Sequence, residues 1–169
     1  VVANPVAGRW SDGKGGSTWP SLAVALQRSI AIAEPRVDGE RGLMRFGIGA
    51  VLAPGGETVI GAVVIGDAVT EDDARAAART SGAEVAFVDG EKVFASSARA
   101  NPGDAAEIAR SLAGATGDAP RAVTVAGRAY AAIAVPLPRM TDRGLVSELT
   151  PPSARAVLFA ETPAPAPKP

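Results

Sequence analysis

Two long apolar runs, each of strand length, dominate the pattern of hydrophobic and polar positions in the middle of the chain. Leu43–Ala53 and Thr58–Gly66 are joined by Pro54-Gly55-Gly56. Glycines between two apolar runs are typical of a short hairpin, because glycine tolerates positive φ. In Leu43–Leu52 both alternating sets of side chains are apolar or glycine except at Arg45, which favours a central strand covered on both faces. The pattern therefore predicts a β-hairpin at the centre of the fold.

A helix and a second hairpin are predicted directly after these two strands. The helix covers Thr70–Thr80, with Thr70 as N-cap and Asp73 three residues later, close to a capping box. The acidic triplet Glu71-Asp72-Asp73 lies in the first turn, where the helix dipole favours negative charge, so helix initiation explains it. Ser81-Gly82 ends the helix. The second hairpin has two short strands and a tight turn: Glu84–Asp89, Lys92–Ser96 and Asp89-Gly90.

The remaining patterns predict two more helices, a third hairpin and a closing strand. Apolar positions at helical spacing predict a helix over Ser21–Ala33, ended by Glu34-Pro35 and followed by a polar connection, Pro35–Arg41. The later elements are a helix over Asp104–Ala113, a hairpin of Ala122–Val125 and Ala129–Val135 turning at Gly127-Arg128, and a strand over Arg155–Ala160. We expect a flexible leader over residues 1–19, one domain over 20–161 and an Ala/Pro-rich linker tail over 162–169.

Composition limits the chemistry that this chain can perform. Of its 169 residues 47% are hydrophobic and only 4% aromatic, so we expect a core of small side chains in close approach. The chain has neither cysteine nor histidine, which excludes disulfides, the usual zinc sites and every His-based nucleophile system. A formal net charge of −1 offers no basic footprint for nucleic acid. An enzyme would have to work with Asp, Glu, Lys, Arg, Tyr or Ser alone.

Two glycine motifs match nucleotide-binding loops in spacing only. Gly8–Lys14 fits G-x-x-x-x-G-K, but Gly15 follows where Mg²⁺ binding requires a Ser or Thr hydroxyl. The G-x-G at Gly47–Gly49 lies inside a predicted strand and not at a strand-to-helix turn. We interpret the first motif as a solvated loop and the second as a close backbone approach or a bulge. No cofactor is expected.

Three stretches of the chain resemble the extracytoplasmic Cache family, whose members are PAS-like sensory domains of bacterial sensor kinases, chemoreceptors and cyclases. Val59–Ser97 is similar to the family's succession of strand, acid-capped helix, strand and D-G hairpin. Val123–Pro138 resembles its late hairpin, which leaves the sheet through Pro-Leu-Pro, and Arg155–Glu161 resembles its closing strand. The likeness covers most of Leu43–Glu161.

The resemblance implies an α+β fold with a PAS-like antiparallel sheet of about five to seven strands and flanking helices. Such a sheet forms a pocket in which apolar walls and a few inward polar groups bind a small ligand. The candidate ligand-binding residues are Arg45, Tyr130, Arg128 and Lys92. Arg45 would clamp a carboxylate if it faces the pocket, and would be a solvated strand residue if it does not. If they do not bind a ligand, Tyr130 would be a core residue and Arg128 a solvated one. No catalytic residue or metal ligand is expected.

Three functions stay open on the sequence, the third being an enzyme that works without His or Cys. The first is a non-enzymatic, extracytoplasmic (periplasmic) signal-input domain of a membrane-bound bacterial signal-transduction protein. Its expected partners are a small-molecule ligand, other domains of a longer chain and a second copy in a homodimer, and not nucleic acid. The alternative is a profilin-like or roadblock-like domain for protein interaction or structural dimerisation. The longest apolar run, Val59–Ile65, is far shorter than a membrane span, so membrane segments would lie outside this sequence.

Overall fold

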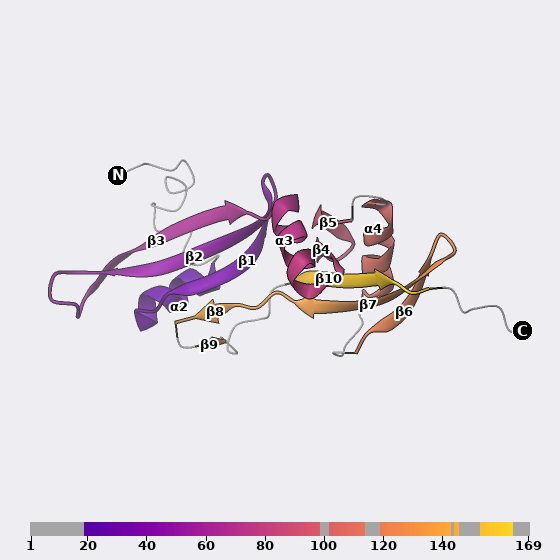
Figure 1. Ribbon diagram of the computed structural model, residues 1–169. Helices are drawn as coiled ribbons and strands as arrows, with labels where there is room; N and C mark the ends of the chain where they lie inside the picture. The colour runs from indigo at the N-terminus through magenta and orange to yellow at the C-terminus, as the bar shows by residue number, and fades with distance from the viewer. Residues whose placement is uncertain (1–18, 99–101, 114–118, 143, 146–152, 164–169) are drawn as a thin grey trace, which may run out of the picture. The chain divides into compact units, whose positions relative to one another are not determined.

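The computed structural model describes residues 19–98, 102–113, 119–142, 144–145 and 153–163, and they form an α+β fold (Figure 1). The strands among these residues make two antiparallel sheets. The chain divides into two compact units. Unit 1 takes its described residues from 19–36, 44–67 and 138–145, and unit 2 takes them from 37–43, 68–137 and 153–163. The predicted α+β class is confirmed.

The first sheet supplies the core of unit 1. Its strand order is β3-β2-β1-β8-β9, and α2 (Pro20–Arg28) precedes it in the chain. The strands are β1 (Ile32–Asp38), β2 (Gly42–Leu52), β3 (Val59–Ala68), β8 (Met140–Thr141) and β9 (Gly144–Leu145). The buried side chains of the core come from α2 and its flanks and from β1 and β2: Trp19, Leu22, Ala25, Ile30, Ile32, Met44, Phe46 and Ile48. The predicted hairpin of β2 and β3 is present.

The helix predicted over Ser21–Ala33 is longer than the helix that the structure contains. α2 ends at Arg28, because Ser29 adopts the left-handed conformation (φ 54°) and caps the helix by donating its N–H to Ala25. β1 begins at Ile32, so the predicted helix over Ser21–Ala33 and the predicted polar connection over Pro35–Arg41 both give way to a strand. Pro35 lies in β1 beyond Ile32 and Ala33, the two residues that the register pairs with β8.

The prediction that β2 is covered on both faces is also wrong. Met44, Phe46 and Ile48 are buried, whereas Arg45 and Gly47 between them are exposed. A strand with apolar or glycine residues on both faces need not be buried on both faces. In the described sheet, the face of β2 that carries Arg45 and Gly47 is exposed to solvent. Close backbone approach occurs at Gly66 on β3 and not at Gly47, since a Cβ at Gly66 would lie 2.6 Å from Phe46 Cε1.

The second sheet and two helices form unit 2. Its strand order is β5-β4-β10-β7-β6, so the last strand in the chain lies at the centre of the sheet. The elements are α3 (Glu71–Ser81), β4 (Glu84–Asp89), β5 (Lys92–Ser96), α4 (Pro102–Ser111), β6 (Arg121–Val125), β7 (Arg128–Pro136) and β10 (Ala154–Glu161). α4 packs its apolar face on the sheet through Ala105, Ile108 and Ala109, and Leu112 just beyond its end joins them; each is at most 3% exposed.

Capping and turn residues explain where the helices and strands of unit 2 begin and end. Thr70 and Asp73 form the expected capping box, and Gly82 ends α3 in the left-handed conformation (φ 72°). The predicted bounds of β4 and β5 are confirmed. The third hairpin turns at Ala126-Gly127, both with positive φ, so Arg128 is the first residue of β7 and not part of the turn.

The leader over residues 1–18, the G-x-x-x-x-G-K match and residues 164–169 lie outside the described residues. Trp19, the last residue of the predicted leader, is instead a core residue of unit 1 and only 1% exposed. Among the described helices, none is both long and apolar enough to cross a membrane.

Candidate functional site

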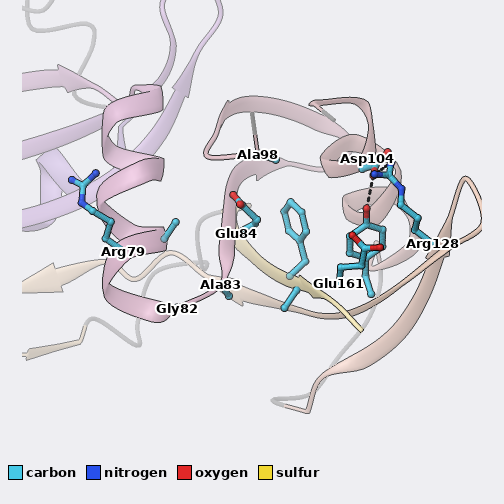
Figure 2. A pocket seen from close by; sticks show the side chains of 12 residues that line it. Arg79, Gly82, Ala83, Glu84, Ala98, Asp104, Arg128 and Glu161 are labelled. Carbon is cyan, nitrogen blue, oxygen red and sulfur yellow. Dashed lines mark hydrogen bonds and ion pairs between the residues drawn. The ribbon is translucent and has the colours of Figure 1, made fainter. Parts of the chain in front are cut away.

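The candidate site is a pocket of about 710 Å³ within unit 2 (Figure 2). The end of α3 and the connection to β4 line one part of it, and the start of α4 and the start of β7 line another. The last residues of β10, Phe159 to Glu161, complete the wall. The pocket therefore lies where two helices meet one end of the sheet.

Asp104 is the centre of the polar group in this pocket. It lies in the first turn of α4 and is 8% exposed. Its Oδ2 accepts a hydrogen bond from Arg128 Nη2 at 2.5 Å and another from the Tyr130 hydroxyl at 2.6 Å. Arg128 and Tyr130 are two residues apart on β7, so both side chains project from the same face of the strand. The two donors stabilise the negative charge of a nearly buried carboxylate.

Contacts with Phe159, Arg128 and Asp104 hold Tyr130 in a defined orientation. Its ring meets Phe159 edge to face, with the ring centroids 6.0 Å apart. The guanidinium carbon of Arg128 lies 6.0 Å from the centroid of the Tyr130 ring. The hydrogen bond to Asp104, together with burial, raises the pKa of the Tyr130 hydroxyl above its ordinary value of 10.0. Tyr130 is therefore a neutral donor near neutral pH.

Two further carboxylates border the pocket. Glu84, the first residue of β4, accepts a hydrogen bond from Ser97 Oγ, and Ser97 Oγ in turn accepts one from the Val85 N–H at 2.8 Å. Glu161, the last residue of β10, is exposed at the pocket wall. The pocket thus combines three carboxylates, the guanidiniums of Arg79 and Arg128, a phenol and an apolar aromatic ring.

The four residues predicted to bind a ligand fall in different places. Arg128 and Tyr130 lie together in the pocket. Arg45 belongs to unit 1, where its side chain is 54% exposed and pairs with Asp67 at 2.6 Å. Lys92 lies over the ring of Phe94, 4.9 Å from its centroid, and does not line the pocket. The structure brings together only the two candidates from β7.

Sequence reasoning missed the acidic side chains of the site. Asp104 was recognised only as the start of a helix, and its contact with β7 spans more than twenty residues of sequence. No local pattern signals such a contact. Glu84 and Glu161 read as ordinary polar strand ends. The spacing of Arg128 and Tyr130 at i and i+2 was the one available signal for a shared strand face.

Unit 1 contains a second polar cluster, which is already satisfied internally. Glu34 is 4% exposed and accepts hydrogen bonds from Ser21 Oγ at 2.5 Å, from Arg139 Nε at 2.5 Å and from the Trp19 indole N–H. These bonds occupy both carboxylate oxygens, so the cluster is best explained as a structural brace between α2, β1 and the start of β8. Among the described residues, no group of carboxylates is placed to hold a metal ion.

Comparison with known proteins does not assign the chain to a family. No family model, no curated protein and no solved structure matches it. The Cache resemblance therefore stays a prediction. The geometry of the pocket carries the functional argument.

Proposed function

We propose that this chain is a non-enzymatic sensory domain that binds a small ligand in the pocket of unit 2. The observation that carries the proposal is the pocket itself, in which Asp104, Arg128 and Tyr130 form a polar group beside the aromatic wall of Phe159. Concave sites with apolar walls and a few oriented polar groups are typical of small-molecule binding. As the Cache resemblance implies, the domain would be the extracytoplasmic input of a bacterial signal-transduction protein.

The strand order of unit 2 supports the PAS-like part of this proposal. Counted within the unit, the strands run in the order 2-1-5-4-3, with α4 between the second and third strands. We take this as the PAS-like arrangement that the resemblance implies. In it the pocket borders the central strand β10, so bound ligand would contact the last strand of the unit.

A ligand screen tests the proposal. We expect one class among amino acids, organic acids, amines and purines to raise the melting temperature of the purified protein, because a ligand that binds only the folded state stabilises it. Arg128→Ala should abolish that shift. Arg45→Ala is the matched control and should leave it intact, because Arg45 lies on the surface of unit 1.

One surface observation favours the alternative, a profilin-like or roadblock-like interaction domain. β3 is the terminal strand of its sheet and exposes Ile60, Val63 and Ile65 by 64%, 51% and 68%. Exposed apolar edge strands are sites where another chain can pair. If no compound shifts the melting temperature at millimolar concentration, the ligand-binding proposal fails and the interaction domain takes its place.

A further inference from the structure

The strand register places an acidic and aromatic strip along one face of the second sheet. Glu84 on β4 is paired directly with Phe159 on β10, and Glu161 on β10 is paired directly with Tyr130 on β7. Directly opposed residues in antiparallel strands project from the same face, and so do residues two apart on one strand. All four side chains therefore belong to one face, across three neighbouring strands. All four line the pocket.

Two guanidinium groups line the pocket, and that of Arg128 is already engaged. Arg128 forms an ion pair with Asp104, whose carboxylate also accepts the Tyr130 hydroxyl. Arg79 lines the pocket, but Figure 2 shows its guanidinium directed away from Asp104 and Glu161. Among the described residues, Glu84 and Glu161 have no cationic side chain within ion-pair distance. Within the part of the chain that the structure describes, the strip therefore has negative charge without an ion-pair partner.

We infer that the pocket selects a small organic cation, an amine or a quaternary ammonium. This rests on the proposed ligand-binding function and names the class of ligand. The carboxylates of Glu84 and Glu161 attract an ammonium group, and Phe159 and Tyr130, which are 3% and 6% exposed, form an apolar wall beside them. The guanidinium carbon of Arg128, 6.0 Å from the Tyr130 ring centroid, shows that a cation is accommodated beside this wall. An anion would instead meet the like charges of Glu84, Asp104 and Glu161.

Choline and its neutral carbon isostere, dimethylbutanol, provide a matched pair of probes, with butylammonium as a primary amine and succinate as an anion. Isothermal titration of the full chain should give binding of at least one ammonium probe at least about tenfold tighter than dimethylbutanol. Glu161→Gln keeps the shape of the side chain and should weaken that binding at least about fivefold. Glu107→Gln, an exposed position on α4 outside the pocket, is the control and should leave binding unchanged.

Each other outcome overturns the inference in a recognisable way. Binding of succinate but of neither ammonium probe would refute the cation class while the ligand-binding function stands. Ammonium binding that is equal in wild type, Glu161→Gln and Glu84→Gln would place the cation elsewhere on the protein. If neither these probes nor any compound of the wider screen binds, the proposed function and the inference fail together.

Discussion

At the scale of single residues, the pocket depends on one carboxylate that satisfies two donors. Asp104 accepts hydrogen bonds from Arg128 and Tyr130 on the same oxygen. A carboxylate in the first turn of a helix is also favoured by the helix dipole. These interactions hold both donors in one geometry within the pocket. A pre-organised site loses less conformational freedom when it binds.

Tyr130 allows a direct test of this arrangement, because it is the only tyrosine in the chain. Its pKa is raised in the folded state, mainly by the hydrogen bond to Asp104, so the near-ultraviolet absorbance of tyrosinate should appear at higher pH in the native protein than in denaturant. Above the unfolded pKa of about 10 the folded state binds more protons than the unfolded state, so stability must fall as the pH rises towards the folded pKa.

The control for this titration is Tyr130→Phe. Without the phenol, the fall in the free energy of unfolding above pH about 10 should be absent. Asp104→Asn should bring the absorbance midpoint back towards the ordinary value, because the carboxylate that favours the protonated phenol is gone. A native midpoint equal to the denatured one would contradict the hydrogen bond between Tyr130 and Asp104.

At the scale of elements, sequence patterns located most strands and helices because their signals are local. The capping box of α3, Gly82 at its end and the Asp89-Gly90 turn each depend on residues close together in sequence. The failure over Ser21–Ala33 has the opposite cause. Apolar residues there fit helical spacing, but the left-handed Ser29 and the pairing of Ile32 with Thr141 decide the outcome. Pairing over such a separation leaves no mark in a local pattern.

The packing of β3 against β2 depends on a glycine, and a pair of substitutions measures this. Gly66→Ala should destabilise unit 1 by about 1–3 kcal/mol, because its Cβ would lie 2.6 Å from Phe46 Cε1. The Phe46 ring cannot move aside freely, because it is buried and packs edge to face on Trp19, with the ring centroids 5.0 Å apart. Denaturant unfolding followed by tryptophan fluorescence gives the free energy.

Gly47→Ala is the matched change on β2. Its Cβ would meet no described atom within 4 Å, so we expect a neutral effect or a gain of about 0.4–1 kcal/mol from the stiffer unfolded chain. Equal effects of the two substitutions would show that the close approach at Gly66 does not constrain the fold.

At the scale of the whole molecule, the chain contributes separate segments to each unit, and the contacts that assemble them are distant in sequence. Arg139 and Glu34 are 105 residues apart, yet they form a buried ion pair within unit 1. The sequence therefore indicated an α+β protein with sheets of hairpins, but not which segments share a sheet. Asp104, Glu84 and Glu161 were absent from the predicted site for the same reason, because the site joins residues that are distant in sequence.

The ion pair between Arg139 and Glu34 should matter more than any surface pair. Arg139→Ala should lower the free energy of unfolding by about 3 kcal/mol, because it leaves the nearly buried Glu34 without its cation. Trp19 fluorescence in a Trp10→Phe background reports on this core. Arg45→Ala is the control, since its pair with Asp67 is exposed and should contribute no more than about 1 kcal/mol. Similar losses in both variants would contradict a bracing role for Arg139.

The central place of β10 has a mechanical consequence. β4 and β7 pair with it on its two sides over Arg155–Phe159, and beyond its end the Thr162 N–H donates to the Ala129 carbonyl at 2.8 Å. Ladder hydrogen bonds in antiparallel sheets run perpendicular to the strands. Tension applied along β10 would therefore shear both ladders at once, whereas an edge strand such as β6 could be peeled away one bond at a time. Within unit 2, pulling β10 along its axis would therefore break both of its ladders together.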